Sequence, residues 1–207
     1  MEFGSAGSAG GISEVTGDSC SFSELEGEFL AALSDGMGSG DAAGRESENL
    51  LDLFSRLIDI GFDIGSAAEY VNELLSEYSD GDIYATLEAI RIDLSSGSAK
   101  LIKHGAPESF VLREGSIYTL YGEGLPMGIV DNAAGYVSSF KLLPGDAVVM
   151  MTDGVSEALG SSLITAIANN VLEFGDAEMA ANSLLDAAAE RGSDDDMTVI
   201  VIRFEAA

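Results

Sequence analysis

The stretch from residue 84 to residue 151 is a series of short apolar or alternating runs separated by turn-forming residues. It includes "YATLEAIRIDL", the turn "SSGS", "AKLIKHG" and "SFVLREGSIYTLYG". Alternation with a period of two is typical of strands that bury one face, and short polar turns favour antiparallel pairing. We therefore expect an antiparallel meander whose turns lie at Ser95 to Ser98, Arg113 to Ser116 and Pro144 to Asp146.

Helical patterns occur on both sides of this meander. Apolar residues at helical spacing predict a long amphipathic helix from Asp41 to about Gly61, and a second helix from about Ser66 to Tyr78 that "SDGD" ends. Two more helices are predicted from "SSLITAIANNVLEF" and "DAEMAANSLLDAAAERG", and "MTVIVIRF" predicts a buried last strand. This order favours an α+β fold, specifically an α/β/β/α sandwich of two antiparallel sheets flanked by helix pairs.

The beginning of the chain divides into two parts. "MEFGSAGSAG" is rich in glycine, serine and alanine, so residues 1–11 are interpreted as an added leader or flexible linker, and residues 12–207 as the folded domain. After it, "GDSCSFSELEGEFLAALSDG" predicts a hairpin whose second strand ends at Asp35. Asp18 and Asp35 would then lie on neighbouring strands.

Charge and cysteine content exclude several classes of function. The 36 acidic residues against nine Lys and Arg give a formal net charge of −27, which repels nucleic acid and anionic lipid headgroups. We expect no nucleic-acid partner and no membrane contact by this fragment. The single cysteine, Cys20, excludes a disulfide framework and favours a cytoplasmic location. A membrane anchor of a longer parent protein would lie in a segment outside this chain.

Four acidic sites share one local context, an aspartate at the end or start of an apolar strand. They are "TGDS" at Asp18, "LSDG" at Asp35, "MTDG" at Asp153 and the triple from Asp194 to Asp196. Each one alone is most simply a turn residue. Four that converge would repel one another unless a cation lay among them, and oxygen ligands without His or Cys select Mg²⁺ or Mn²⁺. The pattern predicts a binuclear carboxylate site suited to phosphoester hydrolysis.

At these residues the sequence resembles the PPM, or type 2C, metal-dependent protein phosphatases, and more closely the bacterial branch represented by stage II sporulation protein E. The resemblance rests on "GDS", "SDGMGSG", "ATLEAIRIDLSSGSAKLIKHGAPESFVLREG", "GLPMGI", "MMTDGVSEA" and "DDDMTVIVIR", which occur in this order. It implies the α/β/β/α sandwich and two Mn²⁺ or Mg²⁺ ions. It also implies a strand before "GDS", which we expect this chain to lack.

The resemblance also implies roles for particular residues. Asp35 would bridge both metals and hold the nucleophilic water, and Asp18 and the Gly36 carbonyl would serve one metal. Asp153 and Asp195 would serve the other, with Asp194 and Asp196 as neighbours or caps. The helix pair from Asp41 to Tyr78 directly follows the bridging loop, which leads to the hypothesis that its movement regulates metal occupancy.

The implied substrate is a phosphoserine or phosphothreonine protein, in this branch a phosphorylated anti-anti-sigma factor of the STAS type whose dephosphorylation promotes sigma-factor activation in sporulation. Two alternatives stay open: a stress-response phosphatase of the same branch with another STAS substrate, and a catalytically silent, metal-gated binding module. Homodimer formation is also open. His104, the only histidine, is an alternative general acid, although a structural role is the simpler interpretation.

Overall fold

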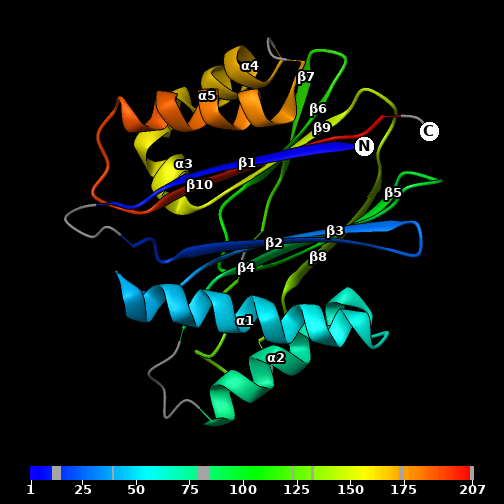
Figure 1. The fold of residues 1–207 in the computed structure, drawn as a ribbon, viewed down its shortest axis with the longest axis vertical. Coiled ribbons are helices and arrows are strands. Elements are labelled where there is room, and N and C mark those ends of the chain that lie inside the picture. Colours follow the sequence, from blue (N-terminus) through cyan, green and yellow to red (C-terminus); the bar gives the residue numbers. More distant parts are fainter. Residues whose placement is uncertain are drawn as a thin grey trace. The chain divides into compact units, whose positions relative to one another are not determined.

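The computed structural model describes residues 1–10, 15–38, 40–78, 84–122, 124–131, 133–172 and 175–205. The described residues form two compact units, each built on one antiparallel sheet with its own helices (Figure 1). Unit 1 comprises residues 1–14, 107–121 and 142–207, and unit 2 comprises residues 15–106 and 122–141. Among the described residues, no helix is both long enough and apolar enough to cross a membrane.

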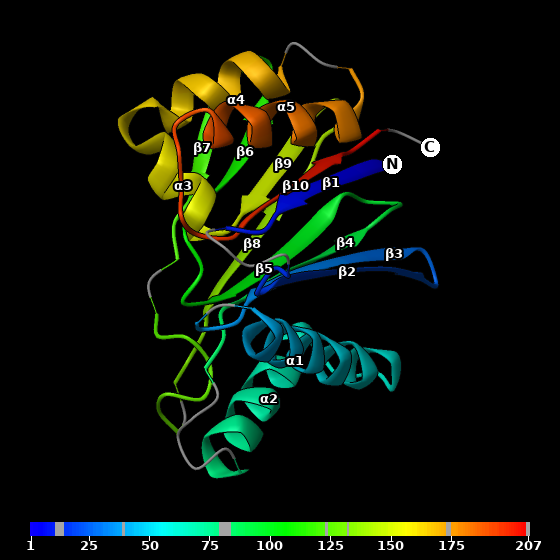
Figure 2. The same cartoon turned by 60° about the vertical axis from the view of Figure 1, so that its left-hand side comes forward.

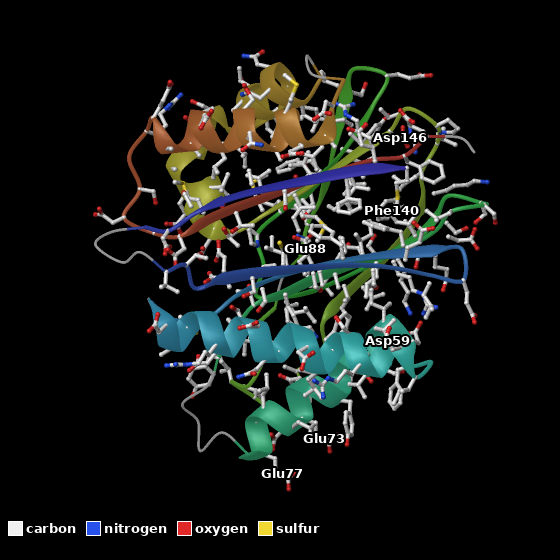
Figure 3. All side chains as sticks on the ribbon, viewed as in Figure 1. Asp59, Glu73, Glu77, Glu88, Phe140 and Asp146 are labelled. Atoms are coloured by element: carbon white, nitrogen blue, oxygen red, sulfur yellow. The ribbon has the colours of Figure 1, made fainter. Side chains whose placement is uncertain are left out.

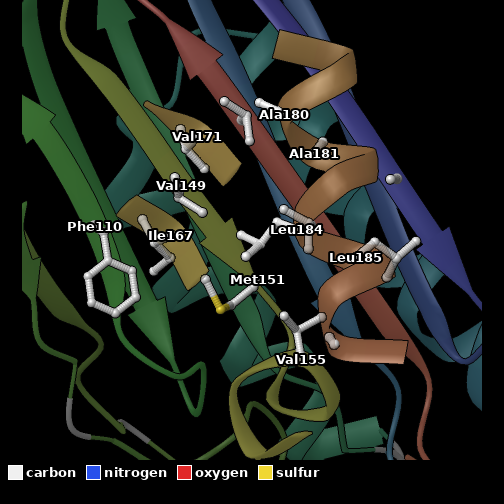
Figure 4. Packing of buried hydrophobic residues seen from close by; sticks show 14 of the residues in the cluster. Phe110, Val149, Met151, Val155, Ile167, Val171, Ala180, Ala181, Leu184 and Leu185 are labelled. Atoms are coloured by element: carbon white, nitrogen blue, oxygen red, sulfur yellow. The ribbon is translucent and has the colours of Figure 1, made fainter. Parts of the chain in front are cut away.

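Unit 1 has the strand order β1-β10-β9-β6-β7. Its helices α4 and α5 pack on this sheet through a cluster of buried aliphatic side chains that includes Val149, Ile167 and Leu184 (Figure 4). The elements are β1 Glu2–Ser8, β6 Ser109–Arg113, β7 Ser116–Leu120, β9 Ala147–Met151, α3 Asp153–Leu159, the 3₁₀ turn Gly160–Ser162, α4 Leu163–Val171, α5 Ala177–Ala189 and β10 Met197–Arg203.

Unit 2 has the strand order β2-β3-β4-β5-β8, and helices α1 and α2 lie on one face of this sheet (Figure 2). Phe54, Ile64 and Val71 of the helices are fully buried in a cluster with Leu87 and Ile102 of the strands. The elements are β2 Asp18–Leu25, β3 Glu28–Asp35, α1 Asp41–Asp59, α2 Ile64–Tyr78, β4 Leu87–Asp93, β5 Ser98–His104 and β8 Tyr136–Lys141.

The predicted fold class is confirmed in its elements: two antiparallel sheets, each with helices, in an α+β order. The hairpin ending at Asp35 and the helix beginning at Asp41 form as predicted. Helix α2 begins at Ile64, two residues earlier than expected. The "SDGD" stop lies outside the described residues.

The interpretation of the first residues was wrong. Instead of a flexible leader, Glu2–Ser8 forms strand β1, which pairs along its whole length with β10 and supplies the edge strand that we expected to be missing. The small side chains have a packing reason, because helix α5 crosses directly over β1. A Cβ built on Gly4 would lie 2.3 Å from the Glu178 backbone, which is closer than any real contact. The same composition that is typical of a linker is required here for close packing.

The predicted single meander was also wrong, since its strands are shared between the two sheets. Strands β4, β5 and β8 belong to unit 2, and β6, β7 and β9 belong to unit 1. Pro144 to Asp146 is therefore no hairpin turn, because β8 before it and β9 after it lie in different sheets. Alternation reports which residues are buried but carries no information on which strand pairs with which.

The close approach of α5 to β1 provides a test of whether Glu2–Ser8 forms a packed strand or a flexible leader. We expect Gly4→Ala to lower the free energy of unfolding by about 1–3 kcal/mol, because the added methyl group overpacks the β1–α5 contact. Gly175→Ala is the matched control, since a Cβ there meets no atom within 4 Å. Urea denaturation compares the two variants with the unaltered chain. Equal stability of Gly4→Ala and the unaltered chain would contradict the packed β1.

Candidate metal centre

Asp18 and Asp35 lie directly opposite each other on strands β2 and β3 of unit 2. Cβ atoms of directly opposed residues in an antiparallel pair are about 4.5–5.5 Å apart, so these side chains share one face at close range. Asp18 is only 6% exposed, although Asp35 is half-buried. Two carboxylates placed in this way repel each other unless a proton or a cation lies between them. We call Asp18 and Asp35 the carboxylate pair.

The backbone around Asp35 is held on two sides. The Asp35 N–H donates to Thr86 Oγ1 at 3.0 Å, and its carbonyl accepts from the Thr86 N–H at 2.8 Å. The Gly36 N–H donates to the Gly17 carbonyl at 3.1 Å, which ties the end of β3 to the start of β2. A Cβ at Gly36 would lie 2.1 Å from the Ala43 carbonyl oxygen, so only glycine fits beneath helix α1. These bonds fix where the Asp35 side chain begins.

Helix α1 is fastened to the other strand of the pair. Ser47 Oγ lies 2.6 Å from the Gly17 carbonyl oxygen and 2.8 Å from Ser19 Oγ. Gly44 lies against the Thr16 carbonyl, since a Cβ there would approach its oxygen to 2.7 Å. Helix α1 therefore contacts the backbone just before Asp18 and the Ser19 side chain just after it, as well as Gly36.

The motif "GLPMGI" lies beside the same loop. Met127 is fully buried, and its N–H donates to the Ala85 carbonyl at 2.8 Å. Ala85 in turn forms a bridge with Gly36. The motif is thus separated from the Asp35–Gly36 bend by the single backbone segment at Ala85.

A second acidic group lies in unit 1, where β9 ends and β10 begins. Thr152 and Thr198 join these two strand ends: the Thr152 N–H donates to the Thr198 carbonyl at 3.0 Å, and the Thr198 N–H donates to Thr152 Oγ1 at 2.9 Å. Asp153 follows at the start of helix α3. Its Oδ1 is shielded from solvent and accepts no hydrogen bond from the described residues. A buried carboxylate oxygen without a donor is a suitable ligand for a hard cation.

The aspartate triple separates into different environments. Asp196 is 8% exposed, and its Oδ1 accepts from the Gly10 N–H at 2.6 Å. Asp195 is exposed, and its Oδ1 accepts from the Asp196 N–H at 3.0 Å. Gly154 packs on this turn, because a Cβ there would lie 2.1 Å from the Asp196 carbonyl oxygen. Asp196 has a structural role, whereas Asp195 keeps oxygen lone pairs for a ligand.

The predicted residues are thus brought together in two groups: Asp18, Asp35 and Gly36 in unit 2, and Asp153 and Asp195 on adjacent turns of unit 1. The described residues contain no group of three or more His, Cys, Asp or Glu side chains already gathered as a metal site. The donors are carboxylates and a carbonyl, which fit Mg²⁺ or Mn²⁺ rather than Zn²⁺. The opposed carboxylate pair and the shielded Asp153 oxygen support this fit.

A buried ion pair next to the carboxylate pair was missed by the sequence analysis. Lys103 Nζ lies 2.9 Å from Glu88 Oε1, and both side chains are 1% exposed (Figure 3 labels Glu88). Glu88 lies opposite Leu33, two residues before Asp35 on the same face of the sheet. The only sequence signal for this ion pair was a charged residue at an inward position on each of two neighbouring strands. Removing one partner of such a pair is costly because it leaves a buried charge.

His104 is buried on the other face of this sheet, opposite Leu87. Burial lowers the pKa of the imidazole from 6.5 to about 4, so the side chain is neutral at physiological pH. A Cβ at Gly135 would lie 2.3 Å from His104 Nε2, which shows how tightly the ring is enclosed. The position supports the structural role of His104 and not that of a general acid beside Asp35.

Comparison with known proteins places this arrangement in a class. A solved structure of the PP2C phosphatase domain and a fragment of the regulatory domain of SpoIIE from Bacillus subtilis matches with a TM-score of 0.86 and 31% identity, over 98% of this chain and 62% of that chain. The catalytic domain of the serine/threonine phosphatase PstP, solved in complex with two manganese ions, shares the fold with a TM-score of 0.78 and 17% identity, over 97% of this chain and 96% of that chain. The fold is that of a PP2C, or PPM, phosphatase domain.

The family is equally clear. The family model "Stage II sporulation protein E (SpoIIE)" matches residues 26–205. Stage II sporulation protein E of Bacillus subtilis is 33% identical over 210 residues, which cover 98% of this chain and 25% of that protein. The chain belongs to the stage II sporulation protein E family, and it spans about a quarter of the length of this curated relative.

The buried His104 predicts a specific pH dependence of stability. The pKa is lower in the folded than in the unfolded chain, so between pH 6.5 and about 4 the unfolded chain binds a proton that the folded chain does not. As the pH falls through this window, His104 should cost about 3 kcal/mol of stability, with no further loss below it.

The measurement is urea unfolding of the unaltered chain and of His104→Gln at several pH values across this window. The carboxylates titrate in both proteins, so the difference between the two pH profiles isolates the histidine. Parallel profiles would contradict a buried, neutral His104.

Proposed function

We propose that this chain is a metal-dependent serine/threonine protein phosphatase that hydrolyses phosphoserine on an anti-anti-sigma protein of the STAS type. The observation that carries the proposal is the directly opposed carboxylate pair, Asp18 and Asp35, at the positions where the family's motifs "GDS" and "SDGMGSG" occur. Membership of the stage II sporulation protein E family supports the reaction and the class of substrate.

Five residues would hold two Mn²⁺ or Mg²⁺ ions. Asp35 would be shared by both ions and would hold the nucleophilic water, Asp18 and the Gly36 carbonyl would serve one ion, and Asp153 and Asp195 the other. The oxygen-only donor set and the shielded Asp153 oxygen support this assignment. When bound, the ions would polarise the phosphoryl oxygens and lower the pKa of water, so that it attacks at neutral pH.

The protein's own residues would position the groups that hold the metal ions. Hydrogen bonds in both directions with Thr86, and one donated to the Gly17 carbonyl, fix the Asp35–Gly36 bend, so the carboxylate and the carbonyl would need little reorganisation when a substrate arrives. Asp196 holds its turn through the Gly10 N–H and leaves Asp195 available. His104 has no part in this scheme, because attack by activated water does not require it.

Release of phosphate from a phosphorylated STAS protein in the presence of Mn²⁺ tests the proposal. We expect Asp35→Asn to lower the rate about a hundredfold or more, because even residues that only support metal ligands change activity by 10–100-fold. Asp52→Asn is the matched control, since Asp52 is an exposed aspartate of helix α1 that pairs with Arg56. It should keep full activity.

The outcomes separate the alternatives. Release that is independent of Mn²⁺, or equal in Asp35→Asn, would contradict the mechanism. Mn²⁺-dependent release from a stress-response STAS protein but not from a sporulation-type one would favour the stress-response alternative. Binding of Mn²⁺ and phosphoprotein without release would favour the silent binding module.

A further inference from the structure

A pocket lies on unit 2 between helix α2 and the segment that leads into β8. It has a volume of about 430 Å³ and is lined by Phe62, Glu69, Tyr70, Asn72, Glu73 and Ala133, among others. None of these residues belongs to the candidate metal centre. The pocket combines two aromatic rings with two carboxylates.

Helix α2 carries charge of one sign only. Its sequence, "IGSAAEYVNELLSEY", contains three glutamates and no basic residue. Glu69, Glu73 and Glu77 are spaced four residues apart, so they form one stripe, and all three are exposed (Figure 3 labels Glu73 and Glu77). Within the described part of the chain none of them forms an ion pair, as Lys100 does with Asp63 nearby. Like charges at this spacing destabilise a helix, so an external cation would relieve a cost that the chain itself does not offset.

The aromatic rings beside this stripe are also exposed. Phe62 and Tyr70 are 37% and 44% exposed, with ring centroids 6.2 Å apart and planes inclined by 45°. Aromatic faces attract organic cations, and the guanidinium group of arginine can contact a ring and bond to a carboxylate at the same time. A divalent metal ion would use the carboxylates but gain nothing from the rings.

The wall of the pocket is fixed before anything binds. Asn72 is 1% exposed, its Oδ1 accepts from the Gly128 N–H at 3.0 Å, and its Nδ2 donates to the Val130 carbonyl at 3.1 Å. These two bonds hold helix α2 to the segment after "GLPM". Val130, whose carbonyl accepts one of these bonds, is 46% exposed. A preformed pocket with few polar anchors is typical of a recognition site.

We propose that this pocket is a docking site for a partner protein that inserts an arginine side chain flanked by apolar residues. The guanidinium group would contact the rings of Phe62 and Tyr70 on one side. On its other side it would bond to the carboxylates of Glu69 and Glu73. The net charge of −27 would draw a basic segment toward the chain, and the aromatic pair would select the site among the many acidic positions. The proposal goes beyond the phosphatase function and does not depend on it.

The test uses N-acetyl-arginine amide as the probe, added to the isotope-labelled chain while backbone amide shifts are followed by NMR. The uncharged citrulline analogue and N-acetyl-leucine amide are the comparison probes. We expect saturable shifts at Phe62, residues 69–73 and Val130 with the arginine probe alone. Tyr70→Ala should weaken binding about two- to fivefold, because a cation–π contact with an exposed ring is lost.

Glu73→Gln keeps the shape of the side chain and tests the charge, in case Tyr70→Ala perturbs folding. It should weaken binding severalfold, whereas Glu178→Gln, an exposed glutamate on helix α5, should leave it unchanged. The proposal is overturned if the citrulline analogue binds as well as the arginine probe. It is equally overturned if the leucine probe binds as well as the arginine probe, which would identify an apolar occupant. It is also overturned if shifts spread over the whole acidic surface or do not respond to Glu73→Gln.

Discussion

Repulsion between the opposed carboxylates of Asp18 and Asp35 is the interaction on which the proposed metal site depends. A β-hairpin places Asp18 directly across from Asp35, and burial leaves Asp18 little access to water. Like charges at directly opposed positions weaken strand pairing, and a proton or a cation between them would remove this cost. The hydrogen bonds between the surrounding backbone segments hold the two strand ends together and so keep the pair at close range.

The two acidic groups are built in the same way. In each, an aspartate at the end of a strand or shortly after it is followed by a glycine that lies against a carbonyl of another segment: Gly36 against Ala43, and Gly154 against Asp196. A Cβ would approach each of these oxygens to 2.1 Å. Close backbone packing at the glycine thus fixes the backbone from which the preceding carboxylate projects. The glycine after Asp35 and the glycine after Asp153 are therefore both required by the close backbone packing.

How far the sequence predicted the molecule depends on whether the signal was local. The Asp18–Asp35 hairpin and the start of helix α1 follow from nearby turn and periodicity signals, and they were predicted correctly. Strand β1 was missed because its glycines and alanines are explained only by helix α5, far away in the sequence. The pairing of Glu88 with Lys103 was missed because the turn at Ser95 to Ser98 predicts that the two strands pair but not which of their residues lie opposite each other. The short helix α3 was missed because the residues after Asp153 belong to the motif "MMTDGVSEA" and do not show a sustained helical period.

The stability of the chain with and without Mn²⁺ tests the central claim most directly, using Asp18→Asn and calorimetric unfolding. With a chelator present, we predict that Asp18→Asn is as stable as the unaltered chain or more stable, by up to about 1 kcal/mol, because the repulsion is removed. With Mn²⁺ at about a hundred times its dissociation constant, the unaltered chain should gain about 2.7 kcal/mol and the variant clearly less, so that the order reverses. If the unaltered chain is the more stable one in chelator and Mn²⁺ changes neither protein, the carboxylate pair is not a metal site.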